Sequence, residues 1–276
     1  LTNTPNGSET VTVVPSSSTA IYDASGNAAS TSQSNNTVSL NDQTAPSAFT
    51  TGTVVATGGT VVTDYWNSTN TGINITVPVD NDTTLTGGTI QLRAKIDSES
   101  YADLGSAYSI QSNDLNKNKT ISISSSVFEA LSGGIEDSEV VTFTAIITDA
   151  SGNTRTGTAS NNTITIDQTS PTITGTTVTS NNSTISVTFS EAVYNTSSGS
   201  GALEASDFTL SISGGTALVN STPSSISVSG NVYTLGLNLT NTPDGAETVT
   251  VVPSSSTAIY DASGNAASTS QSNNTV

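Results

Sequence analysis

The chain contains no cysteine and no histidine. Their absence excludes a disulfide framework, a Cys/His zinc site, and a nucleophile activated by histidine. Basic residues are also scarce, with 5 Lys and Arg against 22 Asp and Glu, which gives a net charge of −17. This balance argues against binding to nucleic acid or anionic lipid, because both require clustered Lys and Arg. No apolar run approaches the roughly 20 residues that cross a bilayer, so no membrane insertion is expected in this segment. Leu1 opens a polar segment instead of a signal peptide, and any export signal is expected to lie outside this sequence.

What the sequence does contain is typical of β-structure. Ser, Thr, Asn and Gly dominate, and the 33% of hydrophobic residues are concentrated in short Val/Ile/Phe alternations. A length of 276 residues predicts two domains, each with room for its own core.

The two ends of the chain are nearly identical. Residues 1–38 and 239–276 are offset by 238 positions and differ only at Asn6 against Asp244 and at Ser8 against Ala246. This identity predicts a tandem array with a unit of about 238 residues. Residues 1–38 hold too few strands to bury a core alone, and their missing partners should resemble residues 168–238. Either the chain is a segment of a longer array or separate subunits complete each other by strand exchange. We favour the first because the break falls where covalent continuation would be natural.

Short alternating runs separated by turn residues predict β-sandwiches along the whole chain. Residues 1–41 are expected to be the C-terminal part of one domain plus its seam, by which we mean the short stretch of chain where one domain joins the next. Residues 42–167 are expected to form a complete domain, and residues 168–276 a second one. The predicted strands of the first complete domain are 73–79, 89–96, 120–124, 140–149 and 163–167, with one helical turn within 125–134. Those of the second are 184–193, 207–213, 225–229, 232–238, 247–253 and 258–261. The predicted fold class is all-β, with tandem β-sandwich domains in a linear array, which the resemblance described next identifies as immunoglobulin-like.

Several short motifs recur in a fixed order. DASGN occurs at 23–27, 149–153 and 261–265, and the seams read DQTAP before residue 47 and DQTSP before residue 172. FSEAV and ASDFTLSISGG follow in the second domain. In this order and spacing the chain resembles the bacterial immunoglobulin-like repeats of giant surface adhesins and extracellular filament proteins. The resemblance implies sandwich modules joined head-to-tail to neighbouring repeats, exported to the cell surface, often with calcium at the junctions.

Strand direction independently predicts where the acidic residues meet. In a linear array the chain enters each domain at a proximal end and leaves at a distal end, so the hairpin loop before the last strand returns to the proximal end. That loop is DASGN. Asp149 and Asn153 should therefore lie beside Asp42, and Asp261 and Asn265 should face Asp167. Asp23 and Asn27 should face a seam aspartate that precedes this segment.

A second loop is expected to return to the same end. In the first domain it carries Asp80 and Asp82, and in the second it carries Glu191. Clusters of carboxylate, amide and carbonyl oxygens suit calcium and are poor ligands for zinc or copper. Taken singly, each Asp or Asn could instead be an ordinary turn residue.

We therefore expect a non-enzymatic structural repeat of a long extracellular stalk, adhesin or filament with calcium-stiffened junctions. Paired carboxylates could in principle hydrolyse glycosides, but these acids lie at turns and only 5% of the residues are aromatic. The alternatives are a glycan- or protein-binding immunoglobulin-like module and a subunit of a strand-exchanged polymer.

Overall fold

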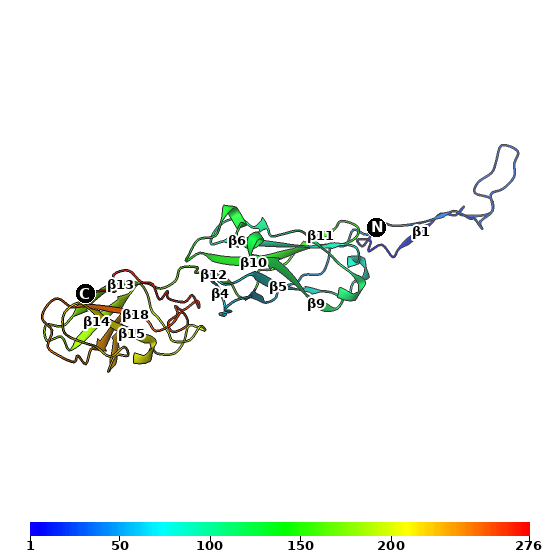
Figure 1. The fold of residues 1–276 in the computed structure, drawn as a ribbon. Helices are drawn as coiled ribbons and strands as arrows, with labels where there is room; N and C mark the ends of the chain where they lie inside the picture. The colour runs from blue at the N-terminus through cyan, green and yellow to red at the C-terminus, as the bar shows by residue number, and fades with distance from the viewer.

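The computed structural model describes all 276 residues and shows an elongated molecule built almost entirely from short strands (Figure 1). Two separate hydrophobic cores divide it, one assembled from residues between 54 and 166 and the other from residues between 173 and 267. Residues 1–38 extend beyond the first core as a thin tail (Figure 1). The helices are all short turns, and none has the length and apolar character that a bilayer crossing requires.

The first core lies between two sheets. One has the order β3-β5-β9, and the other has the order β4-β12-β10-β6-β7, with β11 paired to β10 and β8 paired to β6. The strands are β3 Val54–Thr57, β4 Tyr65–Trp66, β5 Gly72–Val79, β6 Thr89–Ile96, β7 Ala102–Asp103, β8 Tyr108–Ser109, β9 Lys117–Ser124, β10 Val140–Thr148, β11 Thr154–Thr156 and β12 Ile164–Ile166. The short helices are η1 Thr83–Leu85, η2 Ser112–Asp114, α1 Ser125–Phe128 and η3 Leu131–Gly133.

Alternation in the sequence decides which side chains reach this core. Along β6 every second residue is buried, beginning with Ile90 and ending with Ile96, because successive side chains of a strand point to opposite faces. Trp66 is fully buried, and its ring meets that of Phe128 edge-on with centroids 4.7 Å apart. The indole N–H of Trp66 donates to Glu129 Oε1 at 3.2 Å, which satisfies the polar atom of this buried ring.

The second core is smaller and is built around Phe189, Phe208 and Tyr233. One sheet has the order β13-β14-β17-β16, and β15 pairs with β18 in the other. The final residues add a third strand to β18, because the amides of Val249 and Val251 donate to Val276 and Asn274. The elements are β13 Ile173–Val178, β14 Thr184–Phe189, η4 Ala205–Asp207, β15 Phe208–Ser213, β16 Ile226–Ser229, β17 Val232–Gly236 and β18 Thr248–Pro253.

The connectivity of the second core defines an immunoglobulin-like sandwich. Numbered in chain order, its strands 1, 2, 5 and 4 form one antiparallel sheet, and strands 3, 6 and 7 form the other. This is the ABED and CFG arrangement of the immunoglobulin fold. The first core follows the same pattern, with β3, β5 and β9 facing β6, β10 and β12. The all-β, immunoglobulin-like β-sandwich prediction is therefore confirmed.

The tail contains one hairpin. β1 Thr10–Thr12 pairs with β2 Thr37–Ser39 and with no other strand. Every residue of both strands is exposed, including Val11 and Val38. The tail therefore has paired backbone but no core of its own.

Candidate metal centre

The DASGN motif of the second sandwich forms the loop Asp261–Asn265. This loop lies in the seam between the two cores. Asp261, Ser263 and Asn265 are fully buried. The Asn265 side-chain amide donates to the carbonyl of Asp167 at 2.9 Å, so the loop is bonded to the last residue of the first sandwich. The predicted approach of Asp261 and Asn265 to Asp167 thus appears in the structure as direct contact.

The loop holds its shape through its own aspartate. Asp261 Oδ1 accepts the backbone amides of Ser263 at 2.9 Å and Asn265 at 2.8 Å, and Oδ2 accepts the Asn265 side-chain amide at 2.8 Å. Asp and Asn favour such turns because their short side chains bond to nearby backbone. The Ser263 hydroxyl also donates to Oδ1, at 2.8 Å. These bonds fix the Asp261 carboxylate in place and leave free acceptor capacity only on Oδ2, which accepts a single hydrogen bond.

Three carboxylates converge beside this loop. Asp167 from the seam, Glu191 from the segment after β14 and Asp261 from the loop each offer an oxygen, and these oxygens lie within 4.8 Å of one another. Burial, followed by the neighbouring carboxylates of Asp261 and Asp167, raises the pKa of Glu191 to about 7. Burial and the Asp261 carboxylate also raise the pKa of Asp167. Like charges at such distances repel by about 1 to 4 kcal/mol per pair in a surface-like environment.

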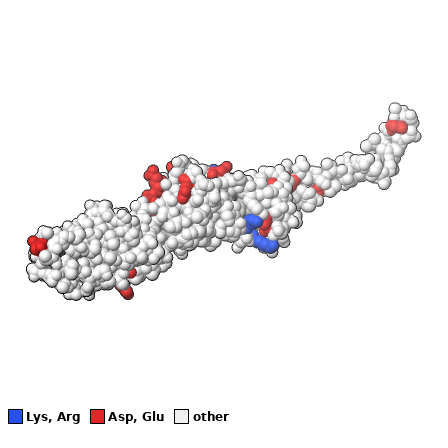
Figure 2. Space-filling view, in the orientation of Figure 1, with Lys and Arg blue, Asp and Glu red and all other residues white.

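No basic side chain relieves this repulsion. The two ion pairs of the structure, Arg93–Asp103 and Lys119–Asp114, both belong to the first sandwich. Of the remaining basic residues, Lys117 donates to Asn113, Arg155 donates to Pro46, and Lys95 lies over the ring of Tyr101. The second sandwich contains no Lys or Arg, and charged atoms are sparse over the face seen in Figure 2.

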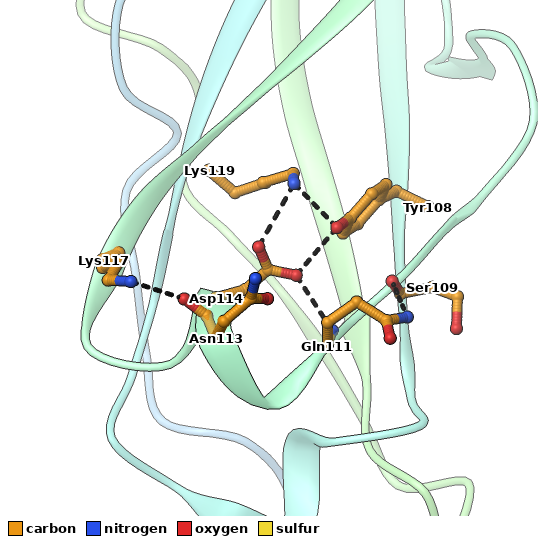
Figure 3. A network of polar contacts seen from close by, with 7 residues as sticks. All are labelled: Tyr108, Ser109, Gln111, Asn113, Asp114, Lys117 and Lys119. Atoms are coloured by element: carbon orange, nitrogen blue, oxygen red, sulfur yellow. Dashed lines mark hydrogen bonds and ion pairs between the residues drawn. The ribbon is translucent and has the colours of Figure 1, made fainter.

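Asp114 shows the opposite arrangement. Figure 3 shows its carboxylate facing Lys119 and the hydroxyl of Tyr108, which lie 3.2 Å and 2.8 Å from its oxygens. Burial raises the pKa of Asp114, but hydrogen bonds from Gln111, Tyr108 and Lys119 outweigh it and leave the pKa below its usual value. This buried acid has its cation within the protein, whereas the seam acids do not.

The donor set at the seam fits a hard cation. It offers three carboxylates together with the carbonyl and hydroxyl oxygens around Ser263, and no nitrogen or sulfur ligand. Calcium accepts six to eight oxygen ligands in flexible geometry, and this composition is unsuited to zinc or copper.

The first seam, around Asp42, repeats the hydrogen bonds that the DASGN loop makes at the second seam. Asp149 Oδ1 accepts the amides of Ser151 at 2.9 Å and Asn153 at 2.8 Å, and the Asn153 side chain donates to the carbonyl of Asp42 at 3.2 Å. Asp42 and Asp149 therefore lie at the same end of the first sandwich. Asp42 Oδ2 is enclosed without any hydrogen-bond partner, so this seam leaves a carboxylate oxygen unsatisfied.

The first seam does not gather three carboxylates as the second one does. Asp82 instead caps η1, accepting the amide of Thr84 at 2.9 Å and its hydroxyl at 2.7 Å. Asp80 accepts hydrogen bonds from Ser47 and from the Asn81 amide, and these lower its pKa. Both residues lie at the predicted end of the domain but serve their own loops.

Asp23 and Asn27 form the same turn in the tail. The Asn27 side chain donates to Asp23 Oδ2 at 2.8 Å, and this bond is the main cause of the lowered pKa of Asp23. Both residues are exposed and face no seam within this chain.

The receiving surface on the first sandwich was missed from the sequence. Asn67 donates from its side chain to the carbonyl of Ser263 at 2.7 Å, and Ser68 donates from its amide and hydroxyl to Asn265 Oδ1 at 3.0 and 2.7 Å. Gly264 faces the same surface, since a Cβ there would lie 2.7 Å from Thr60 Cγ2. The only signal was the turn-forming run NSTN at 67–70, which is indistinguishable by composition from other loops of this chain.

Comparisons with known proteins add little. No family model and no curated protein matches the chain. Among solved structures, the crystal structure of a chicken TCR is similar over 64% of this chain and 86% of its own, with 11% sequence identity and a TM-score of 0.26. The fold assignment accordingly rests on the strand order described above.

Proposed function

We propose that this chain is a structural repeat unit of a long extracellular stalk, adhesin or filament, with calcium bound at its junctions. The observation that carries the proposal is the cluster of Asp167, Glu191 and Asp261 at a seam without any basic side chain. Its context supports the same reading, because the chain carries a near-identical 38-residue segment at both ends. An end-to-end array of such units is the arrangement that this repeat favours.

The three acids of this cluster come from both sandwiches. Asp167 belongs to the end of the first sandwich, whereas Glu191 and Asp261 belong to the second. A bound calcium ion would supply positive charge that converts the mutual repulsion of these acids into attraction. Because the acids come from both bodies, the ion would also restrict their relative rotation. Asn67, Ser68 and Asn265 already hold the two surfaces in contact.

A stalk would then work mechanically. Strands of about ten residues at roughly 3.3 Å each, plus loops, give a two-domain unit an advance of about 80–90 Å. The acidic, Ser- and Thr-rich surface would keep such an array soluble and discourage side-by-side association.

The proposal is tested by thermal unfolding of the full chain in calcium and in excess EDTA, with small-angle scattering under both conditions. Calcium at 100 times its dissociation constant should stabilise the chain by about 2.7 kcal/mol and narrow the distribution of interdomain angles. Magnesium at the same concentration is the control, because it demands a stricter octahedral geometry. Identical melting curves in calcium and EDTA would show that calcium does not stabilise the chain, and would contradict the proposed calcium site.

The binding-module alternative has weaker support. A hollow of about 490 Å³ lies near the proximal end of the first sandwich and has Phe49 as its single aromatic lining residue. Sugar-binding and protein-binding sites usually present several aromatic side chains. A glycan-array screen that returned a specific ligand would favour this alternative over the stalk.

A further inference from the structure

One short turn contains both of the sequence differences between the two near-identical ends of the chain. The turn reads NGS at residues 6–8 and DGA at residues 244–246. Asn6 is the only asparagine of the chain that is followed by glycine. Because glycine has no side chain, its backbone nitrogen can approach the preceding side chain more closely than that of any other residue. This pair therefore allows a reaction that bulkier neighbours hinder.

Hydrogen bonds hold the Asn6 side chain in a geometry that favours this reaction. Asn6 Oδ1 accepts the backbone amide of Ser8 at 3.1 Å and also accepts the Ser8 hydroxyl. The ring closed by the amide bond contains the Gly7 nitrogen, so the Asn6 carboxamide stays folded over the peptide bond to Gly7. Both donors also stabilise the negative charge that develops on Oδ1 when a nucleophile adds to Asn6 Cγ.

Water has access to this turn. Residues 6–8 are exposed, and residues 244–246 are exposed as well, although they belong to a complete sandwich. The Ala246 amide donates to Asp244 Oδ1 at 3.0 Å, so the turn has the same hydrogen bond in both places. The exposure and the shape of the turn therefore belong to the loop itself and do not depend on what packs around the tail.

We propose that Asn6 is a site of spontaneous deamidation, with the Gly7 nitrogen as nucleophile and the Ser8 hydroxyl as the activating donor. The Gly7 nitrogen bonds to Asn6 Cγ, the Cγ–Nδ2 bond breaks, and Nδ2 leaves as ammonia with the proton of the Gly7 amide. Solvent water then opens the succinimide ring at either carbonyl, which gives aspartate or isoaspartate at position 6. The reaction needs no cofactor, and the proposal is independent of the calcium sites.

Deamidation would add a carboxylate beside the first seam. Asn6 and Asp42 line the same hollow, which has a volume of about 420 Å³. Aspartate fits this turn, since the C-terminal copy has aspartate there. Isoaspartate would instead insert a methylene group into the main chain directly after Pro5, whose carbonyl accepts the Gln43 amide and the Thr44 hydroxyl, both at 2.9 Å. That product would therefore weaken the attachment of the turn to the seam.

The test follows the conversion of asparagine in the intact, folded chain. The chain is incubated near neutral pH in water enriched in a heavy oxygen isotope and then cut after its glutamates, and tandem mass spectrometry locates each converted residue. Isoaspartate is scored separately, by the methyl group that an isoaspartyl methyltransferase adds to it. Asn6 should convert to both products, and each should carry the heavy oxygen.

The chain provides its own matched control for the glycine. Asn181 is exposed and accepts the Ser183 amide at 3.1 Å and the Ser183 hydroxyl at 2.7 Å, but Asn182 follows it in place of glycine. Because the side chain of Asn182 hinders the approach of its own nitrogen, Asn6 should convert at least about tenfold faster than Asn181.

The variant Ser8→Ala tests the hydroxyl. It keeps the amide bond of the turn, as Ala246 does in the C-terminal copy, and removes only the second donor to Oδ1. Conversion at Asn6 should slow by about tenfold, whereas conversion at Asn181 should not change. Equal rates at Asn6 and Asn181, aspartate formed without isoaspartate, or an Asn6 rate unchanged by Ser8→Ala would each overturn the proposal.

Discussion

The two ends of this chain are almost the same sequence in two different environments. Their local hydrogen bonds agree. The Asp23 amide donates to the carbonyl of Asn27 at 3.0 Å, and the Asp261 amide donates to that of Asn265 at 3.1 Å. The Ala29 amide donates to Ile21 and the Ala267 amide donates to Ile259, both at 2.8 Å. Their burial does not agree, since Asp23 and Asn27 are exposed whereas Asp261 and Asn265 are fully buried. Local sequence therefore sets the turns and the hairpin pairing, and the remaining strands decide whether those elements contribute to a core. The same distinction applies to the carboxylate cluster, because the turn positions one carboxylate but only the seam gathers three of them.

The largest difference between the two copies is expected when the same side chain is truncated to alanine in each of them. Ile259→Ala removes a fully buried side chain and should lower the free energy of unfolding of the second sandwich by about 2–5 kcal/mol. Ile21→Ala should change it by less than about 0.5 kcal/mol, because Ile21 is largely exposed. Denaturant unfolding of the two variants measures both effects. Equal losses would show that the tail is packed in solution.

The next test separates the turn from the proposed calcium site. Asp261→Asn should remove most of the calcium-dependent stabilisation, which is about 2.7 kcal/mol at 100 times the dissociation constant. Asp23→Asn, the same change in the same motif, should leave that increment unchanged because Asp23 faces no other carboxylate of this chain. The quantity to compare is the shift in melting temperature between EDTA and calcium. If both variants keep the full shift, calcium binds elsewhere.

Glu191 has no counterpart in the tail, so its titration reports on the complete seam alone. Its pKa is raised to about 7 from 4.5, so without metal the folded chain binds more protons than the unfolded chain between these values. The seam should therefore lose stability as the pH rises from about 4.5 to 7 in EDTA. Glu191→Gln should flatten this dependence in melting curves recorded across that range. A profile unchanged by the substitution would place the titrating group outside the seam.

The smallest expected effect comes from making the two copies identical. Asn6→Asp with Ser8→Ala should alter stability by less than about 0.5 kcal/mol, because both positions are exposed. Amide hydrogen exchange should still be fast at Val11 and Val13 and slow at Val249 and Val251. Protection gained in the tail would mean that the two substitutions, and not the missing partners, account for the difference.

The sequence predicted the strands that alternate clearly. Residues 89–96 form β6 at the predicted bounds, and the strands predicted at 73–79, 207–213 and 247–253 agree with β5, β15 and β18 to within one residue. It missed β3, β4 and β13, because short strands at a sheet edge or at the start of a domain need little alternation. The predicted strand 258–261 makes only two isolated bridges, both at Tyr260, one to Tyr194 and one to Ala266.

The candidate site was predictable in part, for a topological reason. A hairpin loop must return to the end where its domain begins, and this placed Asn153 on Asp42 and Asn265 on Asp167. The side-chain directions of Asp80 and Asp82 could not be predicted, because they depend on local capping of η1 and on Ser47. The contacts made by Asn67 and Ser68 depend on how one body docks on the other, which no single-domain pattern encodes.

The parallel pairing of the outer strands has a consequence for tension. In the first sandwich β4 runs parallel to β12, and Thr50 bridges Thr158 in the same sense, so the leading and trailing segments lie side by side. Pulling this body apart by its two termini would slide these segments lengthwise past each other. The hydrogen bonds between them would then share the load at once instead of opening one after another.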